Sequence, residues 1–300
     1  MRIAINHMDK RLKKTLAEST TVNLTGEIIS IFDKVINIEL VYPSCLVAIA
    51  IDSVISSPYM MKTKEHKGFS DLNKKINIGD SVCFNENNSA TIDIFTLDYS
   101  YADTWDSSIN ITPSDKNMIR NKYNHLKNYL SDFGKTGGIL TAFLMIEEDN
   151  YQITPRIYDS YFKLLLDQLE QKMTFDNLQQ FIGLGVGLTP SGDDFITGLL
   201  SVLYCYAKNQ SKVGELFHSL KKFNFRNKTT HVGYYMISNV LTGEINTVLR
   251  DYIILEIDNK RRNEKLIDSI LNIGSTSGTD MLVGVCFGLK YLIKEKKGRT

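Results

Sequence analysis

The residues best suited to chemistry form the run Thr189-Pro190-Ser191-Gly192-Asp193-Asp194, which directly follows a glycine-rich stretch. Ser191 and Asp194 have the Ser-x-x-Asp spacing of a helix capping box, and an apolar run begins at Phe195. The pattern predicts a glycine loop that leads into a helix. A helix start offers free N–H groups and a positive dipole end, which suit an anion. The paired carboxylates suit an amide group or a cation.

A second copy of the motif occurs at Ser277-Gly278-Thr279-Asp280, again followed by an apolar run. In both copies a glycine follows the Asp by four residues, Gly198 in the first and Gly284 in the second. A glycine at that spacing lies on the same helix face as the Asp, where it lets a second backbone approach. We therefore expect Ser191 and Ser277 to cap two related helices whose starts lie close together around one pocket.

The simplest alternative is that both motifs only stabilise helices, with each Ser as N-cap and each Asp complementing the dipole. This alternative does not explain the extra carboxylate of Asp193 or the glycine run. The glycines of that run are Gly183, Gly185 and Gly187. Known phosphate loops do not fit, because Leu188 occupies the third-glycine position of the dinucleotide-binding pattern and no Lys-Ser/Thr pair follows Gly192.

Other segments offer further candidates. Thr229-Thr230 precedes another helical pattern and supplies either an N-cap or hydroxyl groups for the same pocket. Arg156 and Arg226 are candidates for a carboxylate or phosphate contact, because a guanidinium group matches both. Residues 134–138, Gly-Lys-Thr-Gly-Gly, lack the phosphate-loop spacing and are interpreted as a flexible turn. The predicted substrate-binding residues are Gly185, Gly187, Thr189, Ser191, Gly192, Asp193, Asp194, Thr229, Thr230, Ser277, Gly278 and Asp280. No catalytic residue is assigned, and no metal or other cofactor is predicted.

Two different patterns position these residues along the chain. Residues 22–100 contain short, β-branched, partly alternating runs separated by Asn and Asp clusters, which are typical of strands. Apolar residues recur with helical period over about residues 115–133 and again from about residue 155 onward. We therefore predict an α+β protein, with an N-terminal antiparallel β barrel or sandwich in residues 1–110 and a mainly α-helical C-terminal domain in residues 111–300. Residues 1–20 are interpreted as a short basic helix.

Composition excludes several classes of protein. The net charge of +1 does not show the excess of basic residues that is typical of nucleic-acid-binding proteins. The four cysteines are widely spaced without a C-x-x-C pair, which argues against a zinc site or disulfide framework and favours a reducing cytoplasm. The N-terminus lacks a signal-peptide core. The longest apolar helical pattern is too short to span a bilayer, which needs about 20 residues.

The motifs together resemble those of a bacterial family that includes the AllH-type subunit of oxamate carbamoyltransferase. The resemblance rests chiefly on Gly-Leu-Thr-Pro-Ser-Gly-Asp-Asp at residues 187–194, and on Thr229-Thr230 and the second Ser-Gly-x-Asp string. In the N-terminal region it includes Gly79-Asp80 and Trp105. Gly233 departs from the pattern, because we expect a small hydroxyl residue there.

The resemblance implies a subunit of a cytoplasmic carbamoyl-transferring complex in allantoin and purine nitrogen catabolism. The partners implied are an FdrA-like and an AllG-like subunit. The reaction interconverts oxalurate plus phosphate with oxamate plus carbamoyl phosphate, so the expected ligand is one of these small anions. The alternative is a non-catalytic scaffold or ligand-binding subunit whose motifs serve helix capping and packing. No nucleic-acid or membrane partner is expected.

Overall fold

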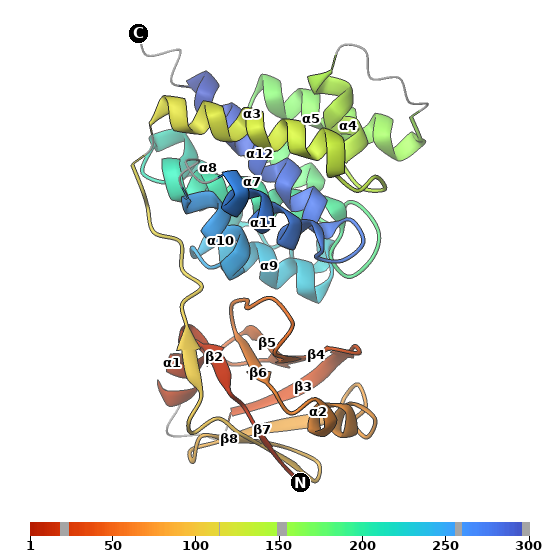
Figure 1. Cartoon of the computed structure of the whole chain (residues 1–300), viewed down its shortest axis with the longest axis vertical. Helices are drawn as coiled ribbons and strands as arrows, with labels where there is room; N and C mark the ends of the chain where they lie inside the picture. The colour runs from red at the N-terminus through yellow and green to blue at the C-terminus, as the bar shows by residue number, and fades with distance from the viewer. Residues whose placement is uncertain (19–23, 114, 149–154, 256–259, 296–300) are drawn as a thin grey trace. The chain divides into compact units, whose positions relative to one another are not determined.

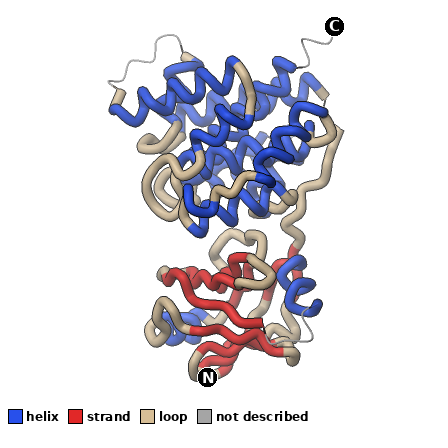
Figure 2. Tube along the Cα trace, turned by 180° about the vertical axis from the view of Figure 1, so that it is seen from behind, coloured by secondary structure: helices blue, strands red, loops and turns tan. Residues whose placement is uncertain are grey.

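The computed structural model describes residues 1–18, 24–113, 115–148, 155–255 and 260–295. The chain divides into two compact units, Met1–Ser108 and Ile109–Thr300. In the described residues, strands occur only in the first unit, and the second unit consists of helices and their connections (Figure 2). The predicted α+β class, with strands before helices, is therefore confirmed.

The first unit is built on one curled, mixed sheet (Figure 1). Its described strands run in the order β1-β9-β8-β7-β3-β4-β5-β6-β2-β10. They are β1 (Arg2–Ala4), β2 (His7–Asp9), β3 (Leu24–Ile31), β4 (Val35–Leu40), β5 (Cys45–Ile51), β6 (Met60–Thr63), β7 (Ser81–Asn85), β8 (Ser89–Ile92), β9 (Phe95–Asp98) and β10 (Asp103–Trp105). Two helices accompany the sheet, α1 (Lys10–Glu18) and α2 (His66–Asn73).

The antiparallel pair β4 and β5 shows why the β-branched runs form strands. Ile36 lies opposite Ile49, and Ile38 lies opposite Val47. All four side chains are completely buried. Directly opposed β-branched residues on one face are the contacts that stabilise a sheet, so this region folds as the alternating pattern predicts.

The prediction of an antiparallel barrel or sandwich is wrong, because the sheet is a mixed half-barrel. Three of its strand pairs are parallel: β1 with β9, β2 with β10, and β5 with β6. The cause lies partly at the N-terminus, where residues 2–9 are extended and only α1 is helical. The Ile5 N–H donates to the Asp98 carbonyl at 2.8 Å, and the Asn6 N–H donates to the Lys62 carbonyl at 2.9 Å. One N-terminal segment thus contributes to two distant parts of the sheet.

The second unit contains the predicted helices and one that the sequence pattern did not indicate, α4. The α-helices are α3 (Lys116–Phe133), α4 (Leu140–Glu147), α5 (Ile157–Gln171), α6 (Phe175–Leu178), α7 (Ser191–Ala207), α8 (Ser211–Lys222), α9 (His231–Leu241), α10 (Thr247–Ile254), α11 (Lys260–Leu271) and α12 (Ser277–Glu295). Short 3-10 helices lie at Gln179–Phe181 and Arg226–Lys228.

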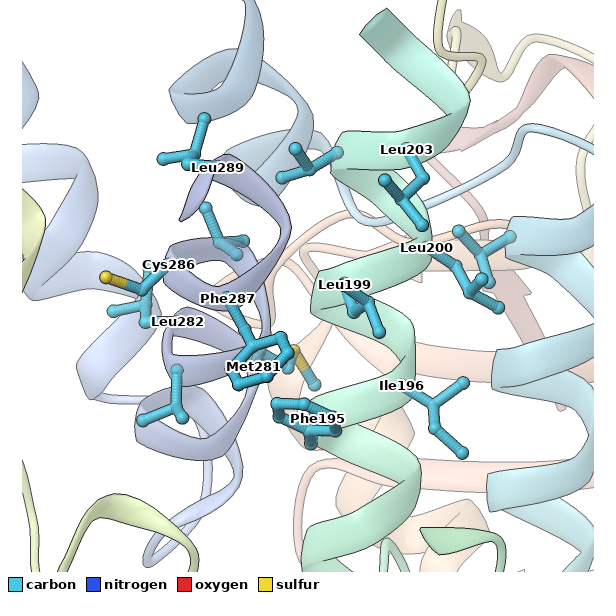
Figure 3. Close-up of a cluster of buried hydrophobic side chains, with 14 of the residues drawn as sticks. Phe195, Ile196, Leu199, Leu200, Leu203, Met281, Leu282, Cys286, Phe287 and Leu289 are labelled. Carbon is cyan, nitrogen blue, oxygen red and sulfur yellow. The ribbon is translucent and has the colours of Figure 1, made fainter. Parts of the chain in front are cut away.

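Helices α7 and α12 form the centre of this unit and pack against each other more extensively than any other two elements. Every residue of α7 except Tyr204 is buried. The Phe195 ring stacks on that of Phe181, with centroids 4.8 Å apart, and meets Phe287 edge to face at 5.6 Å. Figure 3 shows Phe195 beside Met281 and Phe287 at the contact between the two helices. A helix that is apolar on nearly all sides is typical of such a central position.

Candidate functional site

The two Ser-Gly-x-Asp motifs form matching helix starts. Helices α7 and α12 each begin at the serine of their motif. The glycine that follows lies against backbone in both copies. A Cβ added to Gly192 would lie 1.9 Å from the Phe181 carbonyl oxygen, and one added to Gly278 would lie 1.8 Å from that of Ile270. Side chains have no room at either position, so the repeated glycines are explained by close backbone packing.

The capping-box interpretation of the first motif is wrong. Ser191 is the first residue of α7, and the N-cap position is held by Pro190 without a side-chain hydrogen bond. The Asp194 N–H donates instead to the Pro190 carbonyl at 3.1 Å. Ser277 is likewise the first residue of α12. The serines and aspartates of the motifs also make contacts beyond their own helix start, besides the local contacts of Asp194 with Thr189 and of Asp280 with Thr276.

Those contacts cross from one motif to the other. The hydroxyl oxygens of Thr189 and Ser277 are 2.8 Å apart, so the predicted proximity of the two turns is confirmed. The Ser277 hydroxyl lies beside the Asp194 carboxyl and lowers the pKa of that group. Reciprocally, the Ser191 hydroxyl lies beside Asp280 and lowers the pKa of its carboxyl. Each motif thus places its serine next to the aspartate of the other.

Asp194 is a buried carboxyl without a strong partner. Its side chain is 0% exposed. Although the hydroxyls of Ser277 and Thr189 approach it, neither carboxyl oxygen accepts a hydrogen bond of good geometry from the described residues. Burial, followed by the nearby charge of Asp280, raises the pKa of Asp194 well above its ordinary value. Burying an unpaired carboxyl costs free energy, so folding alone gives no reason for this residue.

Asp280 is paired on one side only. Its Oδ1 accepts a hydrogen bond from the Ile139 N–H at 2.7 Å, at the start of α4. Its Oδ2 is buried without a hydrogen-bonding partner among the described residues. Burial raises the pKa of Asp280 to about 6, and the Ile139 N–H opposes this shift. Together with Asp194, it leaves three buried carboxyl oxygens that accept no well-formed hydrogen bond from the described residues where the motifs meet.

The segment before α4 belongs to the same site, which the sequence interpretation missed. A Cβ added to Gly138 would lie 2.2 Å from both carboxyl oxygens of Asp280. The Lys135 N–H donates to the Thr279 hydroxyl at 3.1 Å. Residues 134–138 contain a turn, as predicted, and this turn lies against the second motif. Their Gly-Gly pair was the available signal, because adjacent glycines allow close approach of another group.

Asp193 connects the glycine loop to the start of α9. Its Oδ1 accepts from the Gly183 N–H at 2.7 Å, and its Oδ2 accepts from the Thr229 hydroxyl. Burial raises the pKa of Asp193 to about 6, and these two hydrogen bonds oppose the shift. A Cβ added to Gly233 would lie 2.2 Å from Asp193 Oδ2. The hydroxyl residue expected at position 233 therefore does not fit, because glycine leaves the space that the Asp193–Thr229 pair occupies.

The glycine loop itself has the backbone that its sequence predicts. Three glycines have φ values of 74°, 125° and 97°, which other residues rarely adopt: Gly183, Gly185 and Gly187. Thr230 caps α9 by accepting from the Gly233 N–H at 2.9 Å, and its hydroxyl donates to the Leu188 carbonyl at 2.5 Å. Thr229 and Thr230 thus both anchor the loop. The loop tip remains accessible, with Val186 82% exposed.

The two arginines predicted as anion contacts are engaged elsewhere. Arg156 pairs with Asp159 at 3.1 Å where α5 begins. The Arg226 guanidinium lies over the rings of Tyr234 and Tyr235, 5.3 and 5.7 Å from their centroids. Within the described ranges, no group of three or more His, Cys, Asp or Glu side chains is arranged to hold a metal ion. The arrangement therefore offers carboxyl and hydroxyl groups for hydrogen bonding.

Two protein-family models match the chain. Residues 3–104 match the AllH family N-terminal domain, and residues 181–289 match the oxamate carbamoyltransferase subunit AllH. The chain belongs to the AllH family. The second match covers the glycine loop, α7 and most of α12, so both motifs lie within the AllH region. No solved protein structure significantly matches this AllH-family chain. In its described part, no helix is both long and apolar enough to cross a membrane.

Proposed function

We propose that this protein is a subunit of a carbamoyltransferase complex of the oxamate and oxalurate type, and that it binds a small anionic, amide-bearing ligand where α7 and α12 begin. The family match supports the subunit role. The observation that carries the binding site is the buried, unpaired carboxyl of Asp194 beside the half-paired Asp280. A carbamoyl or carboxamide group supplies two N–H donors, which are what these oxygens lack.

The ligand has a place for its anionic end as well. Gly187 has open space around it, and α7 begins directly after the loop with the positive end of its dipole. The free N–H groups expected at this helix start are mostly occupied, because Gly192 donates to Leu184 and both Asp193 and Asp194 donate to Pro190. Thr189 and Ser277 are partly exposed and lie over the buried carboxyls, so their hydroxyls would be the first groups that a ligand meets. The hydroxyl groups and the helix dipole then favour the anion, and the two aspartates hold the amide.

A second candidate function is a non-catalytic scaffold, which a different observation favours. Asp193 bonds to Gly183 and Thr229, and Asp280 bonds to Ile139. These contacts join loops within the unit and need no ligand. They do not account for Asp194, whose buried carboxyl oxygens accept no well-formed hydrogen bond from the described residues. We therefore place the scaffold second.

The family also suggests a setting. We propose partner subunits of the FdrA-like and AllG-like kinds, a role in allantoin or purine nitrogen catabolism, and a cytoplasmic location. The free thiols of the four cysteines, Cys45, Cys83, Cys205 and Cys286, support a reducing compartment. Co-expression with the two partner proteins, followed by affinity purification, tests the complex. Recovery of this chain without either partner under gentle conditions would contradict it.

Thermal unfolding of the complete chain tests ligand binding. Oxamate, oxalurate, phosphate and carbamoyl phosphate would each be added over a range of concentrations. A ligand that binds only the folded state stabilises it by about 2.7 kcal/mol at roughly a hundredfold excess over Kd. We expect at least one amide-bearing anion to raise the melting temperature in this way. An unchanged melting temperature with all four compounds, for a chain that still assembles with its partners, would support the scaffold instead.

A further inference from the structure

Residues Lys135–Ile139 form a third side of the proposed site. They are tied to the second motif at two points, by the Lys135 N–H to Thr279 and by the Ile139 N–H to Asp280. Between these points, a Cβ added to Gly138 would collide with the Asp280 carboxyl. The start of α4 is thus fixed directly against the carboxyl that lacks a partner on its other oxygen.

This segment also continues the accessible surface of the site. A Cβ added to Gly137 would lie 3.2 Å from the Thr276 methyl carbon, so the two segments are in contact. The next residue, Ser277, contacts Thr189 through its hydroxyl at 2.8 Å. Gly137 is exposed, and the other three residues are partly exposed. A continuous accessible edge therefore runs from residue 137 to the glycine loop, above the buried Asp194.

The charges in this region are unbalanced. Asp193, Asp194 and Asp280 are all completely buried carboxyls. Lys135 is partly exposed, and its ammonium group forms no ion pair or hydrogen bond with any described residue. After it, the N–H groups of Thr136 and Gly137 donate to no acceptor in the described part of the chain, and residues 136–137 form a turn. A cationic side chain followed by free N–H groups has the chemistry that binds a carboxylate or phosphate.

We propose that Lys135 binds the anionic end of the ligand, while the unpaired oxygens of Asp194 and Asp280 accept hydrogen bonds from its amide end. This inference rests on the proposed function, and it adds a specificity-determining residue that separates anionic from neutral amides. The site is then divided by charge. Its acidic side receives N–H donors, and its basic side, at the start of α4, receives the carboxylate or phosphate.

Calorimetric binding of two closely matched compounds to the complete chain tests this role. Oxamate carries one carboxylate and one amide, whereas oxamide carries two amides and no charge. Lys135→Ala should weaken oxamate binding by about tenfold or more, the scale of one charge-assisted hydrogen bond, and should leave oxamide binding within about twofold. Lys135→Arg should retain most of the oxamate affinity. Lys221→Ala, which removes an exposed lysine in the last turn of α8, is the matched control.

The outcomes separate this inference from the function on which it rests. If the wild-type chain binds oxamate and Lys135→Ala binds it equally well, the role of Lys135 is refuted and the site itself stands. Equal weakening of oxamate and oxamide would also overturn the inference, because a loss without charge selectivity reports a change of structure. If the wild-type chain binds neither compound, the proposed binding function fails first.

Discussion

Gly198 and Gly284 make equivalent contacts from opposite sides of the crossing between α7 and α12. A Cβ added to Gly198 would lie 1.9 Å from the Met281 carbonyl oxygen, and one added to Gly284 would lie 2.0 Å from that of Phe195. Phe195 and Met281 occupy the same position in the two copies of the motif. The copies therefore pack with an approximate two-fold relationship, which brings both helix starts and their aspartates together.

The close contact between α7 and α12 predicts that one added methyl group there strongly lowers the stability of the folded protein. Gly284→Ala should lower the free energy of unfolding by about 1–3 kcal/mol or more, because the methyl group would force the two helix backbones apart. Gly214→Ala in α8 is the control, since its Cβ would lie 3.6 Å from the Lys208 carbonyl oxygen, an ordinary contact. That change should be neutral or stabilising by up to about 1 kcal/mol. Urea unfolding measures both, and equal small effects would contradict the close crossing.

The buried carboxyls predict a specific dependence of stability on pH. The folded-state pKa of Asp280 is about 6, above its ordinary value of 3.8, and Asp193 is raised in the same way. The folded state then binds more protons than the unfolded state between these values. Stability should therefore fall as the pH rises through this range, and the melting temperature should be higher near about pH 5 than near about pH 7.

Asp280→Asn tests the assignment of this effect. The variant removes one of the titrating groups, so its melting temperature should change less than that of the wild type between the same two pH values. Asp132→Asn changes an exposed carboxylate in the last turn of α3 and serves as the control. A wild-type melting temperature that rises with pH over this range would contradict the raised pKa values of the buried carboxyls.

The buried ammonium group of Lys122 stabilises the helical unit away from the proposed site, so its removal should lower the free energy of unfolding. Its side chain is 1% exposed. Its ammonium group donates to three carbonyl oxygens at the end of α10, those of Tyr252 at 2.8 Å, Ile253 at 2.7 Å and Leu255 at 2.6 Å. Lys122→Met should cost at least roughly 1.5–3 kcal/mol, the scale of one hydrogen bond to a charged group. Arg120→Met, an exposed change on the same helix, should cost little in the same urea titration.

The fold could be predicted where a local pattern decides it. The β-branched runs at β4 and β5 and the helical period at α3 and α5 identify these elements correctly. Helix α4 is apolar on nearly all sides, with Leu140 to Leu144 buried, so it has no periodicity to detect. The parallel pairs of β1 with β9 and of β2 with β10 were missed because their strands lie far apart in the sequence. Local patterns do not contain such pairings.

The site shows the same division. The repeated Ser-Gly-x-Asp pattern identifies Asp194 and Asp280 as related and predicts that their helix starts meet. It does not reveal which group each carboxyl contacts. Asp280 bonds to Ile139, which is 141 positions away in the chain, and Asp193 bonds to Thr229. Both contacts depend on glycines, Gly138 and Gly233, whose importance is visible only once the helices are packed.

Asp194 carries the central claim, because its buried carboxyl oxygens accept no well-formed hydrogen bond from the described residues. Asp194→Asn keeps the shape of the side chain but replaces the titratable carboxyl, with its second oxygen, by a neutral amide. Since the buried carboxyl is itself unfavourable, the melting temperature should stay constant or rise. A ligand amide held by this group should then bind more weakly by about 1.5–3 kcal/mol. Asp280→Asn is the matched change in the second motif, and its amide oxygen can still accept from the Ile139 N–H.

The most direct measurement is calorimetric titration of oxamate and carbamoyl phosphate into the wild-type chain and Asp194→Asn, with the melting temperature of each protein recorded alongside. The proposed site predicts that the variant loses affinity by about tenfold or more while its melting temperature does not fall. Unchanged affinity in Asp194→Asn, or a loss of affinity that only accompanies a fall in melting temperature, would contradict ligand binding at this carboxyl.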